Sequence, residues 1–297
     1  MSAPDTLSVA DVTPAVADVT PAAPSATAGR LGRLAPYGPA AALVAMIGVF
    51  ALAQGLTYPL LSLRLEAAGI SAEMIGLSGA MTPLGFMLAA PFAPRLAKAL
   101  GTVGALLAMV ALVVAALVAL ASVQDFNLWL GLRFGLGASV AGLYVIGESG
   151  LHRVVPDHAR GRVMGIYNTV MILGYAAGPA LLSVVGTQGV APFLAGIAIV
   201  AAAALPVLVF AKALPVIGDA GEAAGPREAL RFAGLAPALL LACAAVAFFD
   251  HASTALLPLY AMAQGMGESS AMQLATAALL GAMLSQFVIG ALADRMG

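Results

Sequence analysis

Long apolar runs recur along the chain, and they constrain its fold more than any other feature. A helix needs about 20 residues to cross the hydrocarbon core of a bilayer, which is roughly 30 Å thick. Lipid offers the backbone no hydrogen-bond partners, and the runs do not alternate as strands would, so helices are expected. The sequence predicts an all-α, polytopic membrane protein with spans near 38–60, 74–94, 101–122, 127–148, 164–186, 191–213, 236–260 and 270–293.

The composition supports this class and excludes several others. Hydrophobic residues make up 62% of the chain and charged residues 9%, whereas soluble domains carry about 25% charged residues. A net charge of -1 without a basic stripe argues against a nucleic-acid partner. The single cysteine, Cys243, excludes an internal disulfide, and the three histidines form no ligand-spaced cluster. We therefore expect no metal, no cofactor and no enzyme active site.

The first 35 residues differ from the rest of the chain. They are rich in Ala, Pro, Thr and Ser, and the phrase DVTP occurs at 11–14 and again at 18–21. Such low-complexity sequence predicts a disordered tail over residues 1–35. The tail lacks a basic n-region, so it is not expected to be a cleaved signal peptide.

Lysine and arginine predict the orientation in the cell inner (plasma) membrane. With both termini in the cytoplasm, the outer loops hold only Arg64, and one cation, Arg133, lies inside a span. The cytoplasmic segments then hold Arg30, Arg33, Arg95, Lys98, Arg153, Arg160, Arg162, Lys212, Arg227, Arg231 and Arg295.

An internal repeat with a six-span period divides the chain. Residues 59–101 and residues 258–297 each run from a Pro-Leu pair through a short loop and a full span to a loop that ends in glycine. Two six-helix halves would produce such a parallel repeat. The predicted organisation is a six-helix bundle over 36–214, a cytoplasmic linker over 215–232, and a partial second bundle of two helices over 233–297.

Four short motifs resemble those of the major facilitator superfamily. The segment from Gly290 to Gly297, GALADRMG, is similar to the loop signature that follows the second helix of a half. The segments RFGLG at 133–137, RGRVMG at 160–165 and GYAAGP at 174–179 resemble signatures of the fourth helix, the fifth-helix loop and the antiporter fifth helix. The stretch from Arg133 to Arg162 is similar to the YcaD-like subgroup. The resemblance implies a twelve-helix transporter.

The chain departs from this pattern in three ways. The loop motif of the first half is degenerate, with Pro94 and Lys98 in place of a glycine and an aspartate. Leu182 stands where the antiporter motif ends in glycine. The chain also stops in the loop after the eighth span, so we expect four further spans to be missing, either because it is a fragment or because the product is shortened.

Charge within a bilayer is costly and marks candidate functional residues. Arg133, Asp250 and His251 lie inside predicted spans. A carboxyl and an imidazole can take up and release protons, and the resemblance implies that Arg133 assists proton coupling. We expect these three residues to carry transport and proton coupling. The alternative is that they are buried polar groups bonded between helices, with Arg133 snorkelling outward.

The charged groups at the cytoplasmic ends predict a gate. An ion-pair network there would close the inner side in one conformation, and the alternative is a solvated run of charges. The resemblance implies that Asp294 meets the start of the fifth helix. The gate candidates are Glu148, Arg153, Arg160, Arg162, Asp294 and Arg295.

Glycines at small-xxx-small spacing predict close helix packing. Pro179 is expected to bend the fifth helix, because it removes a backbone hydrogen bond. The packing candidates are Gly131, Gly135, Gly137, Gly174, Gly178, Pro179, Gly290 and Gly297.

Together these features predict a secondary active transporter that moves a small organic solute by alternating access in the lipid bilayer, with proton-coupled efflux as the favoured mode. An importer of a metabolite is the first alternative. A second alternative, of another class, is a truncated membrane protein that does not transport. The sequence does not indicate an oligomeric state.

Overall fold

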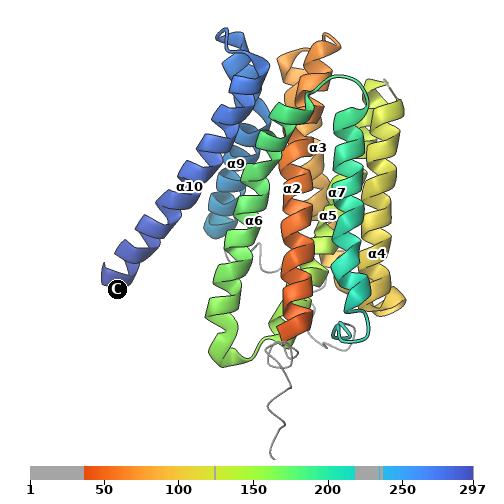
Figure 1. Ribbon diagram of the computed structural model, residues 1–297, viewed down its shortest axis with the longest axis vertical. Helices are drawn as coiled ribbons and strands as arrows, with labels where there is room; N and C mark the ends of the chain where they lie inside the picture. Colours follow the sequence, from red (N-terminus) through yellow and green to blue (C-terminus); the bar gives the residue numbers. More distant parts are fainter. Residues whose placement is uncertain (1–36, 124, 218–233, 235–236, 297) are drawn as a thin grey trace, which may run out of the picture. The chain divides into compact units, whose positions relative to one another are not determined.

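The computed structural model describes residues 37–123, 125–217, 234 and 237–296, and these residues are almost wholly helical (Figure 1). Each of the eight predicted spans overlaps an α-helix, so the predicted all-α membrane bundle is confirmed. In chain order the helices are α2 (Gly38–Ala67), α3 (Ala72–Ala89), the 3-10 helix η3 (Ala90–Phe92), α4 (Ala93–Ser122), α5 (Phe126–Val154), α6 (Asp157–Val185), α7 (Ala191–Val209), α9 (Pro237–Ala263) and α10 (Glu268–Met296).

Several of these helices begin or end away from the predicted span boundaries. Helix α6 begins at Asp157 and not near 164, because Pro156 caps it in an extended conformation and Asp157 lies in its positive first turn. Helix α7 ends at Val209, before the predicted residue 213. Hydropathy marks the part of a helix suited to lipid, whereas capping residues decide where the helix itself begins and ends.

Gly101 divides what would otherwise be one very long helical stretch. The stretch Ala72–Ser122 has 51 residues, which is about 76 Å at 1.5 Å per residue and far exceeds one bilayer crossing. Within α4, Gly101 adopts φ 72° and ψ 160°, a conformation open essentially to glycine alone. This break separates residues 93–100 from 102–122 and lets the stretch supply two spans, as the sequence predicts.

The helices suit a membrane in length and composition. Within the described part of the chain, five helical stretches are long and apolar enough to cross a bilayer, and one of them contains both α3 and α4. These stretches are Gly38–Ala67, Ala72–Ser122, Phe126–Val154, Asp157–Val185 and Ala191–Val209. The chain is therefore a multi-pass membrane protein.

Helix α2 is the central helix of the bundle. It packs against α5, α6, α7 and α9 and lies between α6 and α7 in Figure 1. Large side chains along its whole length, including Leu43, Ile47, Leu56 and Leu60, are almost completely buried. Helix α3 packs mainly on α5, α4 packs on α5 and α7, and α10 packs on α6 and α9.

Glycines allow α2 and α6 to approach closely. A methyl group at Gly178 of α6 would overlap the backbone of Gly55 on α2, and one at Gly174 would meet the carbonyl of Gly48. Pro179 is buried beside this contact, inside α6. The spacing Gly174-xxx-Gly178 therefore lies on the face that meets the central helix.

A second close contact joins α3 to α5, and it differs from the predicted one. A methyl group at Gly137 would overlap the carbonyl of Thr82, and one at Gly85 would overlap the carbonyl of Phe134. Gly131 and Gly135 make no such contact, since a methyl group at either would meet nothing within 4 Å. Gly137, two residues after Gly135, points about 200° away around the helix, toward α3, so packing at Gly135 stays a prediction.

Candidate functional site

A hydrogen-bonded chain of three polar side chains lies inside the apolar bundle. The amide nitrogen of Gln54 donates to the hydroxyl of Tyr58 at 2.6 Å, and the Tyr144 hydroxyl donates to the amide oxygen of Gln54 at 2.8 Å. Gln54 and Tyr58 are one turn apart on α2, so they lie on one face of it, and Tyr144 reaches them from α5. Gln54 is 4% exposed and Tyr58 5% exposed. We call Gln54, Tyr58 and Tyr144 the central polar cluster.

Aromatic rings surround the central polar cluster. Phe50 meets Tyr144 edge to face with ring centroids 6.1 Å apart, and Phe86 of α3 lies 6.3 Å from the same ring. Tyr175 of α6 places its ring 6.5 Å from that of Tyr58. The site therefore offers hydroxyl and amide groups within an aromatic wall built from four helices, which suits an organic molecule with both polar and apolar parts.

Arg133 is buried on the side of α5 that also carries Tyr144. Its side chain is 1% exposed, and its Nη1 donates to the Ser78 hydroxyl of α3 at 3.0 Å. Its Nε is buried and has no hydrogen-bond partner among the residues that the structure describes.

One face of α5 carries these groups. Arg133, Gly137, Tyr144 and Glu148 follow one another at helical intervals, so they form a stripe along the helix. The stripe begins about two turns from the start of α5 at Phe126 and reaches its last two turns. Helix α5 therefore aligns a cation, a hydroxyl and a carboxylate along the interior of the bundle.

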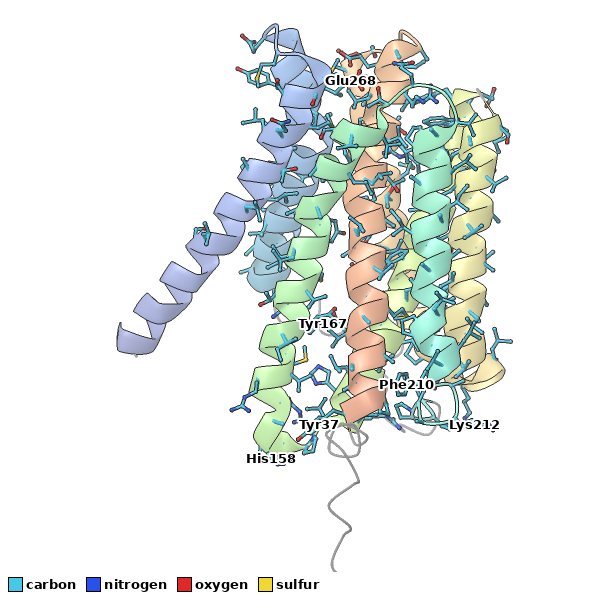
Figure 2. All side chains as sticks on the ribbon, viewed as in Figure 1. Tyr37, His158, Tyr167, Phe210, Lys212 and Glu268 are labelled. Carbon is cyan, nitrogen blue, oxygen red and sulfur yellow. The ribbon has the colours of Figure 1, made fainter. Side chains whose placement is uncertain are left out.

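The carboxylate of Glu148 is bound by a tyrosine of the next helix. The hydroxyl of Tyr167 on α6 donates to Glu148 Oε1 at 2.5 Å. Tyr167 is 2% exposed, and Figure 2 labels it in the lower half of α6. Glu148 is half-buried, so its carboxylate lies between the buried stripe and the lower end of the bundle.

The space beside the central polar cluster is small. A cavity of about 10 Å³, enough for about one water molecule, is lined by Gln54, Thr57 and Tyr58 with apolar residues of α2, α4, α5 and α7. Thr57 donates its hydroxyl to the Ala53 carbonyl of its own helix, so it needs no partner in this cavity. The cavity is large enough for a water molecule but too small for an organic solute.

The predicted gate residues have separate partners. Arg153 donates to the carbonyl of Val216 at 3.0 Å, and Arg160 pairs with Asp157 at 2.6 Å on the surface of α6. Arg162 is exposed. Among the side chains that the structure describes, Arg160–Asp157 is the one ion pair, and Glu148 is bonded to Tyr167 and not to an arginine.

Other predicted residues lie partly or wholly outside the described positions. Helices α9 and α10 contain Asp250, His251, Gly290, Asp294 and Arg295, but their side-chain environments lie outside the description, as does residue Gly297. In the described part of the chain, no group of three or more His, Cys, Asp or Glu residues is placed to hold a metal ion.

The α6–α7 loop connects two parts of the bundle at the upper end in Figure 1. Arg64 of α2 donates to the carbonyl of Gly189 in this loop, and its guanidinium lies 5.5 Å from the centre of the Phe193 ring. Thr187 of the same loop is 3% exposed and donates to Glu268, the first residue of α10. Figure 2 labels Glu268 at this end.

The sequence predicts Arg133 and Glu148 as site residues, but it does not predict the polar and aromatic side chains that lie beside them in the structure. Gln54, Tyr58, Tyr144, Tyr167 and Tyr175 are single polar residues within apolar runs, and they match none of the motifs. One signal was present: tyrosine and glutamine inside a span need a hydrogen-bond partner, so they indicate a site within the bundle.

Comparisons with known proteins agree with the architecture. The model of the Major Facilitator Superfamily matches residues 43–297. The chain is 25% identical over 261 residues to the uncharacterized MFS-type transporter YfkF of Bacillus subtilis, covering 86% of this chain and 66% of that protein. It is 34% identical over 176 residues to an uncharacterized MFS-type transporter of Yersinia enterocolitica, covering 58% of this chain and 45% of that protein.

A third relative, an uncharacterized MFS-type transporter of Yersinia pestis, is 32% identical over 177 residues, with 58% of this chain and 45% of that protein covered. These matches span less than two thirds of the length of the relatives. The family match extends from within α2 to the last residue of the chain and so includes every helix that holds the site. The chain belongs to the major facilitator superfamily.

Proposed function

We propose that this protein is a secondary active transporter that moves a small organic solute across the inner membrane by alternating access. The central polar cluster is the observation that carries the proposal. Three hydrogen-bonded polar side chains occupy a bundle interior that apolar side chains could fill at no cost in desolvation. Polar groups at such depth are typical of a solute pathway.

The position of the cluster suits a site shared between two halves. We propose that residues 36–214 form one six-helix half, that 215–232 link it to the next, and that 233–297 begin the second. In this arrangement α2 and α5 supply one wall of the site and the second half supplies the other. The small size of the cavity beside the cluster supports this division, because that cavity is too small for an organic solute.

Proton coupling and export are further parts of the proposal. Asp250 and His251 are the proposed proton carriers, as titratable side chains within a span, and Arg133 assists them. The resemblance of 174–179 to the antiporter motif supports export. We retain Glu148 at the centre of a cytoplasmic gate, with Tyr167 as its partner in the described conformation.

The test is solute-driven proton movement by the full-length protein in vesicles loaded with a pH-sensitive dye. A panel of organic acids, amines and neutral compounds is added, and the change in internal pH is recorded with and without an uncoupler. At least one compound is expected to drive protons across the membrane in the direction opposite to its own movement, as export by antiport requires. Proton movement in the same direction as the solute would favour an importer.

Two matched variants connect the result to the site. Gln54→Leu removes the amide that joins Tyr58 to Tyr144, and it is expected to abolish the signal. Thr57→Val alters a residue equally buried on the same helix, whose hydroxyl bonds only to its own helix in the structure, and it is expected to retain the signal. If no compound moves protons or accumulates, the alternative of a membrane protein without transport activity replaces the proposal.

A further inference from the structure

Arg133 carries a buried charge that no described carboxylate balances. Its side chain is 1% exposed, and its recorded hydrogen bond goes to the neutral hydroxyl of Ser78. Its Nε is buried without a hydrogen-bond partner in the described part of the chain. The described ion pair lies elsewhere, between Arg160 and Asp157 on the surface of α6. Among the described side chains, the site therefore has a donor without an acceptor and a positive charge without a counter-ion.

Such a group is costly unless an anion or further acceptors join it. A guanidinium away from water loses its hydration, and a single bond to a hydroxyl replaces little of it. Arg64 makes a useful contrast, since its Nε is also buried and unpartnered. Its guanidinium, however, donates to the Gly189 carbonyl, lies over the Phe193 ring and belongs to a partly exposed side chain.

We infer that Arg133 binds an oxyanion of the transported solute, so that the cargo is an organic acid. This inference rests on the proposed transport function. A guanidinium is a planar fork whose parallel N–H groups match the two oxygens of a carboxylate. With Nη1 held by Ser78, the Nε side of the fork is left to meet the anion.

The side chains around Arg133 indicate what the rest of the solute is expected to be. Arg133 shares the stripe of α5 with Tyr144, which belongs to the central polar cluster and has aromatic rings around it. A carboxylate bound at Arg133 would therefore place an adjoining apolar or aromatic body along the stripe of α5, toward Tyr144. The expected class is a small carboxylic acid with an aromatic or apolar body.

The experiment compares acids with neutral compounds of the same shape. Purified full-length protein in detergent is heated with benzoate, phenylacetate or indole-3-acetate, or with the amide of each, and the unfolding temperature is measured. At least one acid is expected to raise the unfolding temperature, with little effect from its amide. Acids that act no more strongly than their amides would overturn the inference.

Variants assign the effect to Arg133. Arg133→Gln is expected to weaken binding of the active acid by roughly 10- to 100-fold, whereas Arg64→Gln leaves it unchanged. Arg133→Lys keeps the charge without the fork and is expected to bind at an intermediate strength. Equal binding by wild-type protein and Arg133→Gln would refute the assignment.

The protein without solute supplies an independent measurement. Because no carboxylate of the described residues balances Arg133, Arg133→Gln is expected to unfold at the same temperature as wild type or higher. A lower temperature that Asp250→Asn restores would mean that Asp250 is the counter-ion, and the inference would fail. Binding in detergent requires no transport, so a protein that binds acids but moves no solute fails the proposed function alone. A protein that exports only amines fails this inference alone.

Discussion

At the scale of single residues, the apolar interior of the bundle is interrupted by the hydrogen-bonded side chains of the central polar cluster. Gln54 is central because its amide both donates and accepts, and so it joins two tyrosines from different helices. A hydrophobic residue at this position would leave both hydroxyls without these bonds. Each lost hydrogen bond costs about 0.5–1.5 kcal/mol, so the cluster holds α2 and α5 in register as well as offering a site.

The bond between Tyr167 and Glu148 gives a prediction of its own. Tyr167→Phe removes a 2.5 Å hydrogen bond to a carboxylate oxygen and is expected to lower the free energy of unfolding by about 1–3 kcal/mol. The measurement is thermal unfolding in detergent. Tyr260→Phe is the control, because Tyr260 is 64% exposed. If the two variants unfold at the same temperature, the bond does not contribute to stability.

The sequence identifies some of these residues more readily than others. Arg133 is recognisable because an arginine inside an apolar run breaks its composition. Tyr144 and Gln54 are not, since they lie 90 positions apart and their bond depends on how α5 packs on α2. Glu148 is recognisable as a charge at the end of a span, and an arginine is its predicted partner. The partner in the structure is Tyr167, because distance along the chain says little about which groups meet across helices.

At the scale of elements, glycines determine where helices break and where they touch. Gly101 and Gly104 lie three residues apart in α4 but have different roles. Gly101 has φ 72° and open space around it, so its requirement is conformational, whereas Gly104 has ordinary helical geometry.

This contrast predicts that replacement by alanine lowers the stability at Gly101 but not at Gly104. Gly101→Ala forces a side chain into a left-handed conformation and is expected to cost about 1–3 kcal/mol of stability. Gly104→Ala meets only Leu100 Cβ at 3.5 Å, an ordinary contact, and is expected to be neutral or slightly stabilising. Thermal unfolding of both variants in detergent tests the pair. A neutral Gly101→Ala would show that the break between residues 93–100 and 102–122 of α4 does not need glycine.

The contact between α2 and α6 predicts a second difference. Gly178→Ala places a methyl group against the backbone of Gly55, which cannot move aside as a side chain can, so we expect loss of at least about 1–3 kcal/mol. Gly165→Ala, on the same helix, meets nothing within 4 Å and is the control. Yield and unfolding temperature after purification are the measurements. Similar behaviour of the two variants would mean that the helices can separate without cost.

The elements themselves are more predictable than their contacts. Apolar length places all eight helices, because the bilayer requires about 20 residues for each. It does not say which face of a helix meets another. Gly137 and Gly135 are both glycines of α5, yet only Gly137 meets α3, and this choice depends on rotation of the helix, which sequence spacing leaves open.

At the scale of the whole molecule, the α6–α7 loop connects the first six helices to α10. Arg64 ties the loop to α2 and Thr187 ties it to Glu268, so one short segment contacts both sides of the proposed division. Movement of the second half away from the first at this end must break the bond between Thr187 and Glu268. The bond therefore favours the conformation in which this end is closed.

Labelling of cysteines can follow this opening. In a Cys243→Ser background, Ala271→Cys places a thiol where the native side chain is 0% exposed, three residues after Glu268. Its reaction with a membrane-impermeant maleimide is expected to be slow, because it needs the end to open. Ser270→Cys, next to it at an exposed position, is expected to react at once and serves as the control for access.

Removing the bond is then expected to accelerate the slow reaction alone. Thr187→Val preserves the shape of the side chain and deletes its hydroxyl, and loss of a hydrogen bond to a carboxylate favours opening by roughly tenfold or more. Ala271→Cys should therefore react about that much faster with Thr187→Val, while Ser270→Cys does not change. Unchanged rates would mean that this bond forms and breaks without controlling the end. If the solute itself changes the labelling rate of Ala271→Cys, the opening belongs to the transport cycle. A solute shifts the equilibrium between the closed and open states only when it binds the two states with different affinity.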